Sequence, residues 1–460
     1  MYNDHKIILG LAPTRRRMYD PSYAFENKRL IFEKVKELSE SDGDIEVVNI
    51  DWLNEEGILI EVEDVSKVAA YFKSKNANAL FMPHCNYGTE EVVAMLGKSM
   101  SVPFLLYAPR DPAPPSEGGR VRQTDAQCGL FPSSKALQRY GVPFTYIENC
   151  PVDSEIFADG FDNFIRAASV VKKTIGMRVG IMNARPKPFL CVMYNEAEIL
   201  EKFGIEIVPL NAVDILNKIN SFTEKHPDDV RAVQEEIALQ MDVTTARPGA
   251  PEKLAALRLT MFEAAKQHNL DAVASECWTV FPQTLGFVPC AAFGDITNCG
   301  LPMGCETDVM CAVTMAMLSA ASRGKGRPFC ADLTVRHPSD DNAELLWHCG
   351  PFPISGAKPE SEPKLNGTVG WWEMEHGDMT ISRLDSLNGK YSLLSGEGIA
   401  VDGPPTNGTY SWFKVSNWAE WERKIIYGPY IHHVAGMHGH WSGVFEEACR
   451  YIGVDIDKMI

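Results

Sequence analysis

Short apolar runs alternate with longer amphipathic segments over the first third of the chain. The short runs are typical of buried strands, whereas the longer segments repeat their apolar positions with helical spacing. The expected strands are 6–11, 45–50, 79–83 and 103–107, and the expected helices are 23–38, 65–75 and 90–98. This alternation predicts parallel βαβ units, whose ligands bind beyond the carboxyl ends of the strands. The arginines at 15–17 and the loop at 84–88 therefore fall on one edge of the expected sheet.

The alternation continues after a long helix expected at 154–174. The expected strands are 178–182, 205–209 and 271–275, and the expected helices are 196–203, 227–240 and 251–268. The same pattern therefore predicts two α/β domains, at 1–160 and 161–326.

The pattern changes after Arg327. Segments become short, and glycine, proline and tryptophan punctuate them, as in Gly350-Pro351 and Gly370-Trp371-Trp372. Short runs with tight turns predict an antiparallel β domain at 327–460, closed by one helix at 444–452.

Composition and charge narrow the class of protein. The 460 residues include 44 Lys and Arg against 61 Asp and Glu, so the net charge is −17. This balance argues against nucleic acid and against an anionic membrane surface as partners. The polar start predicts no signal peptide, and the longest apolar stretch, from Val309, is too short to span a membrane. The twelve cysteines form no C-x-x-C pair, so we expect reduced thiols in a cytoplasmic protein.

The segment 301–318 is the most informative part of the chain. Small and turn residues lead to Glu306 and then to an apolar run, which predicts a loop that feeds a helix with Glu306 at its start. One interpretation is a glutamate that caps a buried helix, because a carboxylate is favoured at a helix N-terminus. Further candidate ligands at Asp332, His348 and the pair His432-His433 favour a functional interpretation.

Glu306, Asp332, His348 and His433 form a candidate metal site. Carboxylates together with imidazoles suit a divalent ion of the Mn²⁺ type, or another divalent cation. A competing interpretation is a zinc site built from the C-terminal histidines, His432, His433, His438 and His440.

The basic triplet that contains Arg16 also has two interpretations. It forms either a solvated basic turn or a clamp for a ligand rich in oxygen atoms, because guanidinium groups bind such ligands in a fork.

Several segments resemble the L-fucose isomerase-like family of sugar isomerases, which is related to L-arabinose isomerase. The resemblance spans nearly the whole chain, and its more specific parts are Cys-Glu-x-Asp-Val at 305–309 and His-Cys-Gly at 348–350. The other similar segments are Pro13-Thr14-Arg15-Arg16, Asn86-Tyr87-Gly88, Cys277-Trp278 with Gln283, Asp332, His432-His433 and Gly453-Val454.

The resemblance implies a fold, an activity and a set of site residues. The fold is α/β, with two Rossmann-like parallel-sheet domains followed by a C-terminal antiparallel β-barrel-like domain. Glu306 and Asp332 are implied as metal ligands and proton-transfer carboxylates, with His433 as third ligand and His348 as a fourth ligand or a group behind one. Which of His432 and His433 ligates stays open. The implied substrate-binding residues are Arg16, Asn86, Trp278, Gln283 and His432.

The implied reaction interconverts an aldose and a ketose in a homo-oligomer that is often a hexamer, with the pocket completed by a neighbouring subunit. Such a reaction moves a proton between C1 and C2, which requires a polarised oxygen and a carboxylate within reach. The substrate is a deoxyhexose or pentose, or else an anionic sugar that carries a sulfonate or phosphate. This chain has Met437-His438-Gly439-His440 after the histidine pair, which departs from the family pattern.

Three hypotheses follow: a metal-dependent aldose–ketose isomerase, a non-catalytic sugar-binding protein, and a zinc hydrolase that uses the C-terminal histidines. Two convergent carboxylates favour the isomerase, because a protein that only binds a sugar has little need of them.

Overall fold

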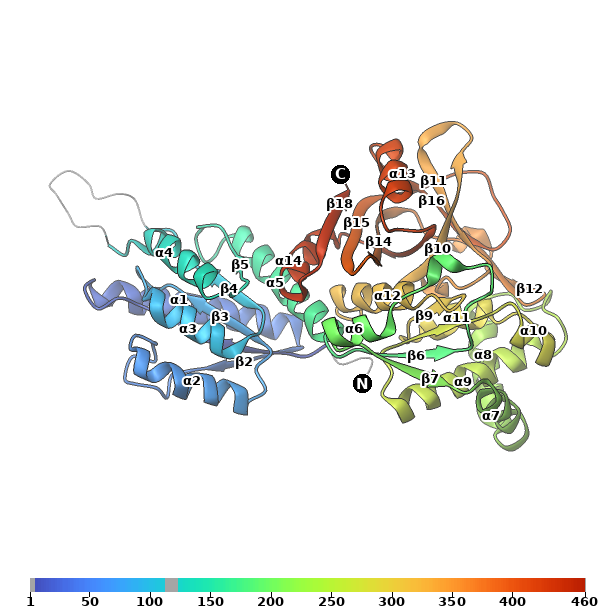
Figure 1. Ribbon diagram of the computed structural model, residues 1–460, viewed down its shortest axis with the longest axis horizontal. Coiled ribbons are helices and arrows are strands. Elements are labelled where there is room, and N and C mark those ends of the chain that lie inside the picture. Colours follow the sequence, from blue (N-terminus) through green and yellow to red (C-terminus); the bar gives the residue numbers. More distant parts are fainter. Residues whose placement is uncertain (1–4, 112–122, 460) are drawn as a thin grey trace. The chain divides into compact units, whose positions relative to one another are not determined.

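The computed structural model describes residues 5–111 and 123–459, which form two compact units, 5–172 and 173–459. The first unit holds one parallel sheet with the strand order β2-β1-β3-β4-β5 (Figure 1). Its strands are β1 Ile7–Leu11, β2 Ile45–Asn49, β3 Ala79–Pro83, β4 Phe104–Tyr107 and β5 Thr145–Tyr146. Its helices are α1 Pro21–Asp42, α2 Val62–Ser74, α3 Glu90–Met100, α4 Ala126–Arg139 and α5 Glu155–Thr174.

Apolar side chains cover both faces of this sheet. Leu80 and Met82 of β3 join a core with α2, α3 and α4, whereas Ala79 and Phe81 join a second core with α1 and α5. Successive residues of a strand point to opposite faces, so a wholly apolar strand is what a sheet covered on both sides requires.

The second unit begins with another parallel sheet, in the order β7-β6-β8-β9. Its strands are β6 Arg178–Met182, β7 Glu206–Leu210, β8 Ala272–Ser275 and β9 Met303–Cys305. Its helices are α6 Glu196–Phe203, α7 Ala212–Lys225, α8 Pro227–Gln240, α9 Ala250–His268, α10 Val280–Thr284, α11 Cys290–Asn298 and α12 Val309–Ala321. A short 3₁₀ helix, η1, occupies Leu190–Val192.

An antiparallel barrel completes the second unit. Its six strands run in the order β16-β11-β10-β17-β14-β15, and β15 pairs with β16 to close the ring. They are β10 Phe329–His337, β11 Asp340–His348, β14 Gly377–Leu387, β15 Lys390–Val401, β16 Thr409–Lys414 and β17 His433–His438. The elements added to the barrel are β12 Lys364–Asn366, β13 Val369–Glu373, β18 Asp455–Met459, α13 Trp418–Tyr427, α14 Ser442–Ile452, and the 3₁₀ helices η2 Ile354–Gly356 and η3 Pro359–Ser361.

These sheets confirm the predicted fold class of two parallel α/β sheets followed by an antiparallel barrel. The division of the chain at residues 160 and 326 stays a prediction. The helix expected at 444–452 is present as α14, but α13 also lies in this last region and β18 follows α14. Among the described residues, none of the helices combines the length and apolarity that a membrane crossing requires.

The prediction that Glu306 starts a helix is also wrong. Helix α12 begins at Val309, and its N-cap is Asp308, whose carboxylate accepts a hydrogen bond from the Cys311 N–H. Glu306 lies between β9 and this cap, in a turn that buries its carboxylate beside His433 instead of using it on the helix.

Candidate active site

Two paired barrel strands place Asp332 beside His433. Strands β10 and β17 are antiparallel, and Asp332 lies opposite His433 in their register. His433 Nε2 lies 3.4 Å from Asp332 Oδ1. On the other side of β10, β11 ends at His348, whose ring centroid is 6.4 Å from that of His433. The barrel therefore brings three of the predicted ligands to one end.

Glu306 reaches the same place from the end of β9 through a tight turn. Glu306 and Thr307 have φ values of 58° and 60°, which residues other than glycine rarely adopt. The Thr307 N–H donates to Ser275 O, which fixes the turn against β8. Gly304 lies two residues before Glu306, and a Cβ there would lie 2.8 Å from Asp308 O, so only glycine fits so close to the returning backbone. Strained backbone of this kind persists where the surrounding structure holds it, often at functional sites.

Two side chains orient the Glu306 carboxylate. The Trp278 indole Nε1–H donates to Glu306 Oε1 at 2.7 Å, and His433 Nε2 lies 3.1 Å from Glu306 Oε2. Trp278 itself is 46% exposed, and Phe189 packs edge-on against it with ring centroids 4.8 Å apart. Part of the indole is thus free to contact a ligand while its N–H holds the carboxylate.

A buried carboxylate behind His433 sets the tautomer of its ring. His433 Nδ1 lies 2.8 Å from Asp308 Oδ2, so Nδ1 donates its proton there and Nε2 faces Glu306 and Asp332. Arg383 donates to the same Asp308 oxygen and also pairs with Asp385. The sequence analysis assigned no role to Asp308 or Arg383. Asp308 could have been suspected only because it is an acidic residue two positions after Glu306, and nothing in the sequence pointed to Arg383.

The charges in this group stabilise one another. Burial opposes ionisation of Asp308, but Arg383 and His433 hold its pKa well below the usual range. Burial likewise disfavours a charged Glu306, yet His433 and His348 leave its pKa below the ordinary value. Burial lowers the pKa of His432, and the neighbouring charge of His433 lowers it further. Both carboxylates are therefore ionised at neutral pH and His432 is neutral.

Three buried polar atoms in this group, Asp332 Oδ1, His348 Nε2 and His433 Nε2, make no well-directed hydrogen bond within the described residues. Two of them are in ion-pair contact only: His433 Nε2 lies 3.4 Å from Asp332 Oδ1 and 3.1 Å from Glu306 Oε2. Ligand atoms of Asp332, His432 and His433 also lie within 4.8 Å of one another. Buried polar atoms are normally satisfied, so unpartnered ones that converge need an explanation such as an ion. Oxygen and imidazole donors of this kind fit a divalent cation.

The remaining predicted residues lie elsewhere. Gln283 is exposed on α10, and its side chain makes no hydrogen bond within the described residues. Asn86 is buried in the first unit, where its side chain accepts from the N–H groups of Arg16 and Gly88 and so joins two loops.

The Arg16 guanidinium lies over the Tyr87 ring, 4.2 Å from its centroid. The ion pairs of the basic triplet are Arg15–Glu56, Arg16–Glu90 and Arg17–Glu61. Each arginine thus already has a carboxylate partner, which weakens the case for an anion clamp.

The four C-terminal histidines of the competing zinc interpretation are not brought together. His438 Nε2 lies 2.8 Å from Glu375 O, and His440 lies between Glu397 and Asp378. Only His432 and His433 belong to the group with Asp332, so the structure offers no four-histidine site among the described residues.

Comparisons with known proteins agree with this geometry. Residues 10–174 match the family described as fucose/sulfoquinovose isomerase, N-terminal domain, and residues 346–460 match L-fucose isomerase, C-terminal domain. A sulfoquinovose isomerase of Alkalicoccus urumqiensis is 24% identical over 347 residues, which cover 73% of this chain and 75% of that protein. A sulfoquinovose isomerase of Priestia aryabhattai is 23% identical over 411 residues, or 87% of this chain and 90% of that protein.

A comparison with solved structures also gave a match. It is a periplasmic solute-binding protein of Actinobacillus succinogenes with bound D-allose, 12% identical, covering 70% of this chain and 93% of that chain. Its TM-score is 0.18, which is too low to indicate a shared fold.

Proposed function

Because the chain belongs to the fucose/sulfoquinovose isomerase family and is an aldose–ketose isomerase, we propose a specific reaction for it. Glu306 and Asp332 move a proton between C1 and C2 of an anionic aldose through an enediol intermediate. The family is one of metal-dependent isomerases, and we propose Mn²⁺ as the ion. Glu306, Asp332 and His433 are its ligands in this proposal, with His348 as the fourth.

The observation that supports this ligand set most strongly is the arrangement of Asp332 Oδ1 and His433 Nε2. Both atoms are buried and make no well-directed hydrogen bond within the described residues, and they lie 3.4 Å apart. Leaving such a group unsatisfied costs about 1–3 kcal/mol. An ion bound between them would satisfy both atoms, and we add His348 to the ligand set because its ring lies beside that of His433 and its Nε2 also lacks a hydrogen bond there.

The two carboxylates suit different parts of the reaction. A bound divalent ion supplies Lewis acidity to the oxygens at C1 and C2 of the sugar. Glu306 is ionised and held in one orientation by Trp278, so we assign it the carbon-bound proton. Asp332 has a side chain that is 21% exposed, so we assign it the neighbouring hydroxyl. The exposed part of Trp278 offers an apolar face to the C–H surface of the sugar.

A cavity on the other side of the Glu306 turn suggests the class of sugar. It has a volume of about 260 Å³ and is lined by Arg185, Glu196 and Thr307 together with Ile181 and residues 192–194. Arg185 Nη1 donates to the backbone carbonyls of Pro186 and Lys187, and its guanidinium has no carboxylate partner within the described residues. Thr307 Oγ1 is buried and makes no hydrogen bond there. A guanidinium without a carboxylate partner, beside a hydroxyl, suits a sulfonate or phosphate, and the acidic Glu196 on the same lining opposes it.

The names of the relatives agree with an anionic sugar, since both are sulfoquinovose isomerases. We therefore propose a sulfonated aldose as substrate, with a phosphorylated aldose as the second choice over a neutral deoxyhexose or pentose. The family resemblance also implies a homo-oligomer in which a neighbouring subunit completes the pocket, with Arg16 and Asn86 among the substrate-binding residues, and we keep this as part of the proposal.

The test of this substrate class compares wild-type protein with the Arg185→Gln variant. With Mn²⁺ present, the wild type is expected to convert a 6-sulfonated aldose with a lower KM than the matching neutral aldose. Arg185→Gln is expected to raise the KM for the sulfonated sugar by about 10–100-fold, because a hydrogen bond to a charged group contributes about 1.5–3 kcal/mol. Ketose formation measured over a range of sugar concentrations gives both constants.

Arg231→Gln on α8 is the matched control, because Arg231 is an exposed arginine remote from this cavity in sequence and element. It should leave both KM values unchanged. Equal losses for the neutral and sulfonated sugars in Arg185→Gln would remove Arg185 from anion binding, and a wild type that prefers the neutral sugar would contradict the proposed substrate class.

A further inference from the structure

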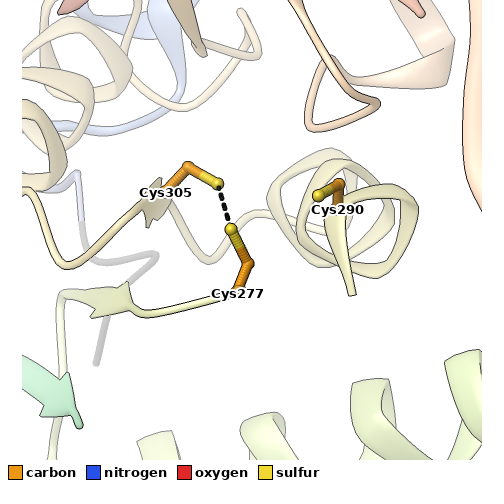
Figure 2. A group of neighbouring side chains, drawn as sticks. All are labelled: Cys277, Cys290 and Cys305. Atoms are coloured by element: carbon orange, nitrogen blue, oxygen red, sulfur yellow. Dashed lines mark hydrogen bonds between the residues drawn. The ribbon is translucent and has the colours of Figure 1, made fainter. Parts of the chain in front are cut away.

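Four cysteines from separate elements meet directly behind the candidate active site. Cys277 follows β8, Cys290 opens α11, Cys305 ends β9, and Cys349 follows β11. The first three side chains are buried, and Figure 2 shows Cys277 and Cys305 with their sulfurs turned toward each other and Cys290 beside them on its helix. Their sulfur atoms lie within 4.8 Å of one another.

The sulfur positions approach those of a metal site. Cys277 Sγ and Cys305 Sγ are 3.6 Å apart, and Cys290 Sγ and Cys349 Sγ are 3.2 Å apart. Around a tetrahedral zinc ion with bonds of about 2.3 Å, neighbouring sulfurs lie about 3.8 Å apart. The sulfurs of Cys277, Cys290 and Cys305 thus lie close to ligand spacing, and Cys349 adjoins the group through Cys290.

We propose that Cys277, Cys290, Cys305 and Cys349 form a second metal site that takes a soft ion such as Zn²⁺. Thiolates select soft or borderline ions, whereas the carboxylates and imidazoles of the first site suit Mn²⁺, so the two sites discriminate by ligand chemistry. The wide sequence spacing explains why no cysteine motif marks this site. Each thiol loses its proton to solvent when it binds the ion.

The position of this site links it to the catalytic residues. Cys277, Cys305 and Cys349 are direct sequence neighbours of Trp278, Glu306 and His348. His348 Nδ1 also lies 3.4 Å from Cys349 Sγ. An ion bound by the thiols would therefore tie together the ends of β8, β9 and β11, and would act as a positioning group for the strained turn at Glu306.

Buried thiols also serve as small apolar groups, and this chain provides an internal comparison. Cys449 is buried on α14 in the same unit and lies near no other thiol among the described contacts. Packing alone accounts for a single buried thiol such as Cys449. It gives no reason for thiols from four separate segments to lie next to one another.

Cobalt binding tests the proposal on the whole protein. The reduced, metal-free protein is titrated with Co²⁺, and the wild type is expected to develop the thiolate-to-cobalt charge-transfer absorption, saturating at one ion per chain. The site of Asp332 and His433 contains no sulfur and gives no such band. Cys290→Ser should lose the band, whereas Cys449→Ser should keep it. Absence of the band in the wild type, or an equal band in Cys290→Ser, would overturn the proposal.

A measurement on the wild type removes dependence on the folding of a variant. X-ray absorption at the zinc edge, after one equivalent of Zn²⁺ is added, should show a sulfur shell at about 2.3 Å. A shell of nitrogen and oxygen alone would count against the thiol site. Neither readout depends on turnover, so failure here leaves the proposed isomerase reaction standing, and loss of isomerase activity leaves the thiol site standing.

Discussion

Glu306→Gln is expected to reduce kcat by about 10³-fold or more while the fold stays intact. Glutamine has the same shape and can still accept the hydrogen bond from Trp278 Nε1. It cannot accept a proton from carbon at neutral pH, and it offers a weaker oxygen to a divalent ion. The initial rate of ketose formation is measured at saturating Mn²⁺ and sugar, and circular dichroism checks the fold.

Glu344→Gln provides the matched control. Glu344 is a buried glutamate on β11, and burial raises its pKa to about 7, so the loss of its charge changes little. Glu344→Gln should leave kcat within about threefold of the wild type, because Glu344 is not among the residues proposed to contact the reacting atoms. An unchanged kcat in Glu306→Gln would exclude Glu306 from proton transfer and leave the reaction to Asp332 alone.

His433→Gln is expected to lower the affinity for Mn²⁺ by about 100-fold or more, since even groups behind a ligand contribute about 10–100-fold. The adjacent His432→Gln should retain the ion. The two rings differ in their surroundings: His433 is 0% exposed, pairs with Asp308 and turns Nε2 toward Glu306 and Asp332. His432 is half-buried and has no such carboxylate behind it within the described residues. Equilibrium dialysis with Mn²⁺ measures both affinities.

The same pair of variants resolves which histidine ligates. His432→Gln should act on KM for the sugar, because this ring lies beside the ligands and packs against Phe189. The reverse result, with the ion lost in His432→Gln and kept in His433→Gln, would assign the ligand to His432. Retention of Mn²⁺ in both variants would contradict the proposed metal site.

Several strands of the parallel sheets are readable from the sequence because they are short apolar runs, as in β3 and β4. Strand β3 matches its expected bounds, and so do helices α6 and α8. The short elements β9 and α10 were not predicted. They have three and five residues, which are too few to show a hydrophobic periodicity. Helix α7 was missed although it has fourteen residues.

The error at Glu306 has a different origin. A carboxylate before an apolar run is usually a helix start, but here Asp308 takes that role two residues later. The deciding feature is the left-handed backbone of Glu306 and Thr307, which contacts with Ser275 and the close packing at Gly304 maintain. Tertiary contacts of this kind cannot be inferred from the local sequence pattern.

The candidate site was predictable only in part. Glu306, Asp332, His348 and His433 were named from the sequence and the family resemblance, and their role as ligands stays a prediction. The structure brings Glu306 and Asp332 within ion-pair distance of His433. Arg383 could not be predicted from the sequence, because it contacts Asp308 from 75 residues further along the chain. The four thiols likewise converge from distant segments, and no spacing rule anticipates a contact that only the packed barrel and sheet create.

Isotope exchange tests the central claim, that Glu306 and Asp332 transfer a proton through an enediol, most directly. A sulfonated aldose is incubated in D₂O with the Mn²⁺-loaded protein, and the sugars are freed of protein and metal before proton NMR. The account predicts a ketose that carries deuterium at C1 and recovered aldose that carries deuterium at C2, with neither in Glu306→Gln. A ketose formed without deuterium at C1 would contradict proton transfer through a solvent-exchanging enediol, because the hydrogen would then have passed from C2 to C1 without exchange with D₂O.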